Sequence, residues 1–316
     1  MPPYAGMTLL IEKLLYFEAP MKYETRVVAF IDILGFKAIL DDTVDKDGSD
    51  NTERISRLVS AYRAIRDVWG LDAKEDLLGS DSPESKKVSI FSDSIVVSFK
   101  AEEPSEVFIT LLEIKWLIMC LISRKILVRG AVSIGKFIHN DYYLFGPALV
   151  EAYTLESKAA MYPRVILDSS IIEASAKAKS RDHSSSQEAN FVRSLLEQDS
   201  DGMYYIDYFF KAQSELNDPQ YDFPEYIENL GDVIRKGLMA SSHHTKADLR
   251  LKYSWMRERY NKMVEIVTNN DSISLLRSEG LEELADFYQG LNKISPDKYN
   301  KAFQLTEKKR AVERRR

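Results

Sequence analysis

Through the first half of the chain, runs of successive apolar residues alternate with segments in which apolar residues recur at helical intervals. The segment RVVAFI is apolar at nearly every position, which is typical of a strand covered on both faces. The segment VSIFSDSIVVSF predicts two short strands around a polar turn. Strands are predicted at 26–31, within 88–99, and at 126–135, 142–145, 164–168 and 202–210, and helices at 55–69, 106–123 and 148–161.

This order predicts an α+β fold. A β-α-β-β-α-β succession with a further α-β unit indicates a mostly antiparallel sheet with helices on one side, a ferredoxin-like sandwich. Polar residues 178–190 predict a loop, and helical spacing returns after residue 224. We expect three regions: an N-terminal extension (1–23), an α+β domain (24–215), and a C-terminal helical region (216–316) that supports a dimer.

Composition narrows the class of protein. The 316 residues are 45% hydrophobic, enough for a substantial core, and 43 basic against 49 acidic residues give a net charge of −6. That charge disfavours general binding to nucleic acid or to anionic lipid. Cys120 is the single cysteine, which excludes an intramolecular disulfide and a cysteine-cluster metal centre. The apolar run at 107–121 is too short to span a membrane and the N-terminus lacks a signal-peptide pattern, so we expect a cytoplasmic protein.

Two carboxylates stand at unusual positions. Asp32 ends the first apolar strand, and Asp93 lies at the turn of the apolar hairpin. In a βαββ sandwich these elements are neighbours, so both side chains can point to one spot. Hard oxygen ligands close together are what Mg²⁺ or Mn²⁺ require. Spacing alone fits equally well an Asp32 that caps a helix and an Asp93 that only makes a turn.

Four segments in order resemble class III nucleotidyl cyclases, the adenylate and guanylate cyclase superfamily. FIDILGF (30–36) resembles the family's opening motif, and SIFSDSIVVSF (89–99) resembles the hairpin with its second metal aspartate. VRGAVSIGK (128–136) and FGPALVEAYTLES (145–157) resemble the later strand and helix. The likeness covers roughly residues 26–170, and four ordered segments are far more specific than any one of them.

The resemblance implies a site for two Mn²⁺ or Mg²⁺ ions. Asp32 and Asp93 would contact both ions, and the Ile33 carbonyl would be a further ligand. The backbone amides of Gly35 and Phe36, where a helix starts, would bind the triphosphate.

Two basic residues are candidates for contact with the phosphates. Lys136 stands where the family commonly has a basic residue for the phosphates, and Arg129 is a second candidate, although either is also explained as a surface charge. The family's transition-state Asn and Arg become Val150 and Thr154. Either catalysis is lost, or another cation such as Lys158 or Arg129 replaces them.

The base-reading positions also depart from the purine cyclases. The family's lysine is Ser89 here, and its aspartate is Tyr143. Both changes disfavour purines, and two hydroxyls without a carboxylate favour uracil over cytosine. Ser92, Glu151 or a water could reverse the choice between the pyrimidines. His139, a lone histidine predicted in a turn nearby, is expected to be solvated.

Within the superfamily, the chain resembles the pyrimidine cyclases of bacterial Pycsar anti-phage systems. The resemblance implies a uridylate cyclase, a phosphorus–oxygen lyase that makes cyclic UMP as an antiviral second messenger for a cyclic-nucleotide-sensing effector. It also implies a homodimer, because class III sites are built from both subunits. The alternatives are a purine cyclase with rearranged base contacts, or a degenerate cyclase kept as a nucleotide-binding dimerisation module.

Overall fold

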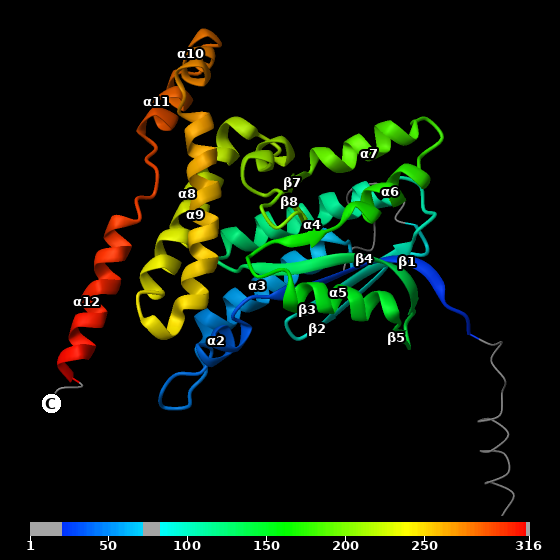
Figure 1. Cartoon of the computed structure of the whole chain (residues 1–316), viewed down its shortest axis with the longest axis horizontal. Coiled ribbons are helices and arrows are strands. Elements are labelled where there is room, and N and C mark those ends of the chain that lie inside the picture. Colours follow the sequence, from blue (N-terminus) through cyan, green and yellow to red (C-terminus); the bar gives the residue numbers. More distant parts are fainter. Residues whose placement is uncertain (1–20, 72–82, 314–316) are drawn as a thin grey trace, which may run out of the picture.

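One open sheet runs through the protein, with antiparallel pairing in all but one of its neighbouring strand pairs (Figure 1). The computed structural model describes residues 21–71 and 83–313. The strand order is β2-β3-β1-β4-β6-β8-β7, and β5 pairs with β4. The strands are β1 (Glu24–Ile33), β2 (Lys87–Phe91), β3 (Ser94–Lys100), β4 (Val128–His139), β5 (Leu144–Phe145), β6 (Val165–Leu167), β7 (Leu196–Gln198) and β8 (Tyr204–Ile206). The predicted α+β class with a mostly antiparallel sheet is confirmed.

Strand β1 is the centre of the sheet because it pairs along its length with both β3 and β4. Since side chains alternate along a strand, its residues divide between two faces. Val27, Ala29 and Ile31 lie on what we call the main-core face. Val28 and Phe30 lie on the opposite face, which we call the α5 face because helix α5 (Pro147–Lys158) covers it. Both faces are buried here, which explains the unbroken apolar run in the sequence.

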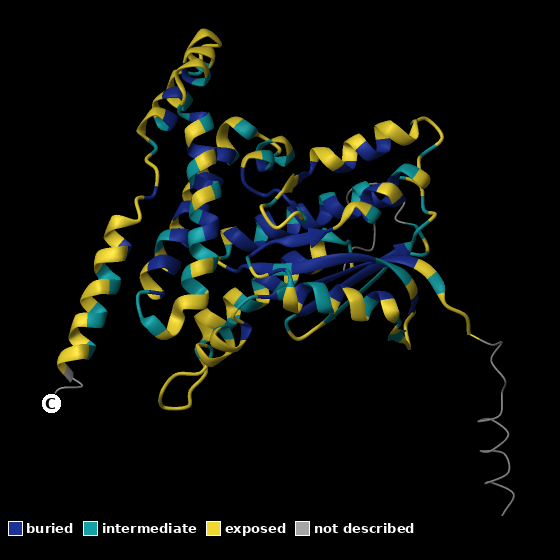
Figure 2. Ribbon diagram, viewed as in Figure 1, coloured by how far each residue is buried: buried dark blue, intermediate teal, exposed yellow. Residues whose placement is uncertain are grey.

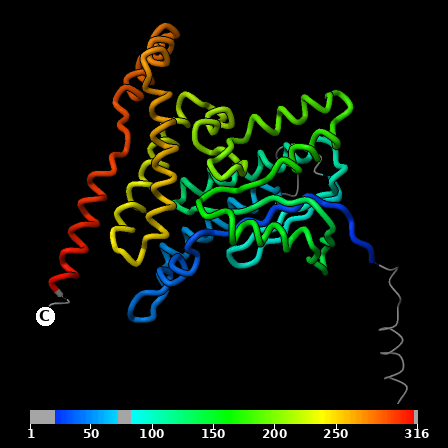
Figure 3. Tube along the Cα trace, in the orientation of Figure 1, coloured from blue at the N-terminus to red at the C-terminus, as the bar shows by residue number. Residues whose placement is uncertain are grey.

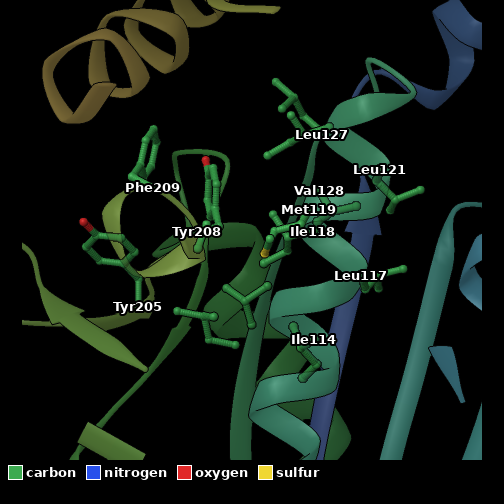
Figure 4. Packing of buried hydrophobic residues seen from close by; sticks show 14 of the residues in the cluster. Ile114, Leu117, Ile118, Met119, Leu121, Leu127, Val128, Tyr205, Tyr208 and Phe209 are labelled. Atoms are coloured by element: carbon green, nitrogen blue, oxygen red, sulfur yellow. The ribbon is translucent and has the colours of Figure 1, made fainter. Parts of the chain in front are cut away.

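The main-core face packs against two long helices, α3 (Thr52–Val68) and α4 (Glu106–Ser123). Helix α4 buries residues on nearly every side, among them Ile114, Leu117 and Ile118 (Figure 4). The short helix α2 (Phe36–Asp41) follows β1 directly. Helix α4 has the bounds predicted from spacing, and α3 begins three residues earlier because Asn51 caps it by accepting from the Arg54 N–H.

Helix α5 (Pro147–Lys158) lies on the opposite face and packs mainly against β4 and β1. Ala148 and Ala152 pack with Val28, Phe30 and Val96 in a second, smaller apolar cluster. Small residues at these two positions let the helix lie close to the sheet. The expectation that all helices lie on one side is therefore correct for α3 and α4 and wrong for α5.

Beyond β4 the sheet continues through a parallel pair, β4 with β6, joined by α5. Helices α6 (Ser169–Lys177) and α7 (Ser185–Ser194) precede β7 and β8. The predicted loop at 178–190 is wrong in its second half, because Ser184 and Gln187 form a capping box that starts α7. That motif is present in the sequence within a stretch that is otherwise polar.

The remaining helices form one end of the molecule (Figure 3). They are α8 (Pro219–Ala240), α9 (Ala247–Val267), α10 (Asn270–Ser278), α11 (Glu282–Gly290) and α12 (Asp297–Glu313), with short 3-10 turns η1 (Phe210–Glu215) and η2 (His244–Lys246). Helices α8 and α9 lie side by side, and α8 also contacts α4. Strand and loop residues Tyr205, Tyr208 and Phe209 pack in the same core (Figure 4).

Helix α9 is joined to the sheet by a buried polar network around Asp199. The Asp199 carboxylate accepts from Arg164 over 2.6 Å, from Trp255 over 2.8 Å and from Arg259 over 2.5 Å. The Arg259 guanidinium also lies over the Trp255 ring, 3.9 Å from its centroid. One apolar core is continuous across residue 215, so the domain boundary there stays a prediction.

Burial follows the layers: the strands are mostly buried, whereas much of α12 is exposed (Figure 2). Residues 1–20 of the predicted N-terminal extension lie outside the described residues. Among the helices of the described residues, each is too short or too polar to cross a bilayer.

Candidate functional site

Asp32 lies near the end of β1 on the α5 face, between two partners in register. Its neighbour on β3 is Ser94, and its neighbour on β4 is Arg129. The four residues before it on β1 are buried, whereas Asp32 itself is only half-buried. The strand therefore delivers this carboxylate to the end of the sheet, where water and ligands can reach it.

Asp93 is brought to the same place by the tight turn between β2 and β3. Ser92 has a φ of 52°, in the left-handed region, which allows the chain to reverse within two residues. The Ile33 N–H donates to the Asp93 carbonyl over 2.9 Å, and the Tyr62 hydroxyl donates to the Ser92 carbonyl over 2.5 Å. The turn is thus fixed to both β1 and α3.

Neighbouring groups affect the protonation of the Asp32 carboxyl group. Burial, the nearby charges of Glu156 and Asp93, and a hydrogen bond with Asp93 raise the pKa of Asp32 to about 6, while Arg129 opposes the shift. Like charges held together in this way favour a shared proton or a bound cation. The predicted meeting of Asp32 and Asp93 at one spot is what the structure has.

Glu156 is a third acid at this site that the sequence reasoning did not identify. It is 2% exposed and forms an ion pair with the Arg129 side chain. Burial is the main cause that raises its pKa, and the Arg129 charge counters it. A signal was present: Ala148, Ala152 and Glu156 follow one another at intervals of four, so a carboxylate occupies an inward position of α5.

The donor set fits a hard divalent cation held partly by substrate. Within the described ranges, three or more acid, histidine or cysteine side chains do not gather closely enough to hold a metal ion by themselves. Mg²⁺ typically uses one or two carboxylates and takes its other ligands from water and phosphate oxygens. Asp32 and Asp93 match that arrangement, and a cation between them would relieve the repulsion that raises the pKa of Asp32.

The residues after Asp32 form an open backbone turn. Gly35 has a φ of 73°, and a side chain at this position would meet no atom within 4 Å. The side chains on either side of this turn are buried: Ile33 is 2% exposed, and Phe36, which begins α2, is also buried. The turn that follows Asp32 in the chain is therefore open around Gly35, and its positive φ is one that glycine adopts readily.

Of the two basic residues predicted to contact the phosphates, Arg129 lies next to Asp32 and Lys136 lies far from it. Arg129 flanks Asp32 and pairs with Glu156, so it is part of the cluster. Lys136 pairs in register with Thr25, seven residues further along β4, which is roughly 23 Å away at the usual rise of a strand. Lys136 does not reach Asp32 of its own chain, so a phosphate role would need a second chain.

Helix α5 carries the positions of the missing transition-state residues. Val150 is 64% exposed, and the Thr154 hydroxyl donates to the Val150 carbonyl over 2.6 Å. That hydroxyl is therefore engaged within its own helix. Lys158 is exposed at the end of α5, one turn beyond Thr154.

Ser89 and the turn that carries Tyr143 are brought together at the other end of the β2–β3 hairpin. The Ser89 hydroxyl lies 2.9 Å from Nε2 of His139, and Lys87 pairs with Asp141 over 3.7 Å. Tyr143 is 45% exposed in the loop just after His139. The expectation of a solvated His139 in a turn is wrong: it ends β4, is 7% exposed, and contacts two serines.

Comparisons with known proteins add no relative. The chain matches no protein-family profile, and a search of curated proteins finds no significant match. The sequence motifs and the geometry of the site are therefore what indicate a function.

Proposed function

We propose that this protein is a metal-dependent nucleotidyl cyclase of the class III type. The observation that carries the proposal is the meeting of the Asp32 and Asp93 carboxylates at one end of the sheet, beside an open glycine turn. The strand order β4-β1-β3-β2, with α3 and α4 on one face, has the connectivity of a ferredoxin-like βαββαβ unit. This connectivity supports the proposal, because a ferredoxin-like sandwich is the fold expected from the sequence.

The reaction would be intramolecular phosphoryl transfer. The ribose 3′-hydroxyl of a nucleoside triphosphate forms a bond to the α-phosphorus, the bond to the leaving oxygen breaks, and pyrophosphate departs. Bound Mg²⁺ or Mn²⁺ would supply Lewis-acid activation of the hydroxyl and neutralise charge on the phosphates.

The chain's own residues position the groups. Asp32 and Asp93 would hold the cations, and the Gly35 and Phe36 amides would bind phosphate oxygens. Arg129, held in place by Glu156, supplies positive charge beside Asp32. With Val150 and Thr154 unable to replace a cationic side chain, Arg129 or Lys158 would stabilise the charge that develops at phosphorus.

The substrate we propose is UTP, with cyclic UMP as a second messenger for an effector in anti-phage defence. Ser89 is too short to contact a purine edge as a lysine would, and Tyr143 adds bulk where a purine reader has a carboxylate. Neither side chain offers cytosine's amino group a charged acceptor.

A homodimer belongs to the same proposal. Phe91 is 53% exposed on the α5 face of β2, where α5 does not extend, and Tyr153 is 55% exposed on α5. A second copy covering this part of the sheet would bring Lys136 or Tyr143 of one chain toward the carboxylates of the other. An obligate interface should bury more than about 1,000 Å² in total.

One experiment separates the candidate functions. The purified protein is incubated with Mn²⁺ and each of the four ribonucleoside triphosphates, and the products are separated by chromatography. Cyclic UMP as the main product supports the proposal. A purine product indicates an adenylate or guanylate cyclase instead, and nucleotide binding without turnover indicates the dimerisation module.

Asp32→Ala and Asp93→Ala are the variants that test the assignment of the site. Both should abolish product formation while the circular dichroism spectrum stays that of the wild type. Full activity in either variant would rule out this site.

A further inference from the structure

We propose that His139 is a positioning residue that fixes the Ser89 hydroxyl as a hydrogen-bond donor. Ser89 then selects a pyrimidine base that has a carbonyl oxygen, and not an amino group, at C4. This inference rests on the proposed cyclase function and names the feature of uracil that the site would recognise. It is carried by a chain of hydrogen bonds across the α5 face, Arg26–Ser98–His139–Ser89.

The chain begins at a buried arginine. Arg26 is 2% exposed, and its Nε donates to the Ser98 hydroxyl over 3.0 Å. Its Nη1 donates to Glu24 over 2.6 Å, and its Nη2 donates to the carbonyl oxygens of Ser85 and Ser98. An arginine can only donate, so the Ser98 oxygen must accept here.

The Ser98 hydroxyl in turn donates its proton in a hydrogen bond to His139. The Ser98 side chain is fully buried, and in the part of the chain that the structure describes its hydroxyl has two side-chain partners, Arg26 Nε and His139 Nδ1, the latter at 2.8 Å. Its proton points away from the guanidinium, and the remaining partner is the imidazole. A buried hydroxyl proton without an acceptor is costly, so Nδ1 accepts it.

A neutral imidazole that accepts at Nδ1 carries its proton on Nε2. Burial and the charges of Arg26 and Lys87 lower the pKa of His139 to about 4, and Asp141 opposes this shift, so the ring is neutral at physiological pH. Nε2 therefore donates to the Ser89 oxygen, 2.9 Å away. The Ser89 proton is then free to be donated to a ligand, which must present an acceptor.

Uracil and cytosine differ in whether they present a hydrogen-bond acceptor at C4. Uracil has a carbonyl oxygen at C4, where cytosine has an amino group that can only donate. With one lone pair of the Ser89 oxygen taken by the His139 N–H and its proton directed at the base, uracil O4 can accept that proton, whereas the cytosine amino group cannot and leaves it without an acceptor. Without His139, the hydroxyl rotates freely and can serve either base.

Two substitutions at one position separate positioning from packing. In His139→Gln, the side-chain amide nitrogen can take the place of Nε2 and still donate to Ser89. In His139→Asn, the shorter side chain can accept from Ser98 through Oδ1 but has no group that reaches Ser89. Both replace a buried ring with an amide, so a purely structural role would affect them alike.

The readout is the product ratio from equimolar UTP and CTP in one reaction with Mn²⁺, which does not depend on the fraction of active protein. We expect His139→Asn to reduce the preference for UTP about three- to tenfold, the discrimination that one hydrogen bond supplies, and His139→Gln to keep it within about twofold. Thermal midpoints measured in parallel report any common loss of stability. An unchanged ratio in His139→Asn, or an equal change in both variants, overturns the inference.

Two further measurements keep this result distinct from a failure of the proposed function. Long-range ¹H–¹⁵N spectra should assign His139 to the neutral tautomer with its proton on Nε2, and a proton on Nδ1 would overturn the inference whatever the enzyme does. If the wild type makes no cyclic nucleotide, the cyclase proposal fails. The ratio of UTP to CTP affinity, measured by equilibrium dialysis on the same three proteins, then decides the role of His139 by the same criterion.

Discussion

The Ile33 N–H donates to the Asp93 carbonyl over 2.9 Å, and this bond joins the end of β1 to the β2–β3 turn. It places two carboxylates, which are far apart in the chain, within hydrogen-bonding reach of each other. Because both elements belong to one sheet, the backbone holds the two carboxylates near each other. A proton or a bound cation would relieve the repulsion between them.

Removing the Asp32 charge should change how stability depends on pH. The folded-state pKa of about 6 lies above the ordinary value of 3.8, so between these values the folded protein holds a proton that the unfolded chain has lost. The free energy of unfolding should therefore fall as pH rises from about 4 to about 6 and then level off. In Asp32→Asn this decline should shrink by about 1 kcal/mol, after allowance for solvent screening. Urea unfolding at a series of pH values measures it, and parallel curves for the two proteins would contradict it.

Divalent cations should stabilise the wild type without substrate. A cation that binds the folded state and not the unfolded chain raises the thermal midpoint with its concentration. We expect Mn²⁺ to raise the midpoint of the wild type above pH 7 and to have little effect on a variant with both Asp32→Asn and Asp93→Asn. Differential scanning fluorimetry with and without a chelator gives the comparison. An equal rise in both proteins would place the cation elsewhere.

Complementation should reveal a site shared between chains. Asp32→Ala chains lack a proposed metal ligand, and Tyr143→Ala chains lack a proposed base contact. If each site takes its carboxylates from one subunit and its base contacts from the other, mixed dimers contain one intact site and should regain about half the specific activity per heterodimer. Activity that stays at the level of the separate variants, or an active protein that sediments as a monomer, would argue for a site within one chain.

Asp199 should contribute more to the free energy of unfolding than Asp201, its more exposed neighbour. Asp199→Ala leaves the buried Arg164 and the Arg259 guanidinium without a shared carboxylate, which should lower the free energy of unfolding by about 3 kcal/mol. Asp201 also pairs with Arg164 but is 43% exposed, so Asp201→Ala should cost about 1 kcal/mol or less. Chemical denaturation compares the two. Equal losses would mean that Asp199 does not hold α9 to the sheet in the way described.

Sequence patterns predicted well those parts of the fold that local spacing decides. The continuous apolar spacing of α4 and the polar turn around Asp93 both specify one structure, and the structure has them there. The side of the sheet that α5 covers could not be predicted in this way. Its inward stripe consists of two alanines and Glu156, too weakly apolar to distinguish one face from the other.

For the site, the sequence could identify acids at element ends but not groups that depend on pairing between distant strands. Asp32 and Asp93 were found because each interrupts an apolar element. The burial of His139 could not be predicted because its partners Ser89 and Ser98 come from other strands, and a single histidine in a polar context gives no sign of burial. Tyr62 was missed for the same reason, since its bond to the Ser92 carbonyl depends on where α3 crosses the hairpin.

The position of α5 after β4 in the chain affects how the protein acquires its site during synthesis. Asp32, Asp93 and Glu156 come from three segments far apart in sequence, and the helix that carries Glu156 packs mainly against β4 and β1, so long-range contacts complete the cluster. Such long-range closures form slowly compared with local helices. A nascent chain that has only reached the end of β4 would contain the strands and turn that carry both aspartates but not Glu156, the acid that pairs with Arg129, so the proposed site would be complete only once α5 has packed onto the sheet.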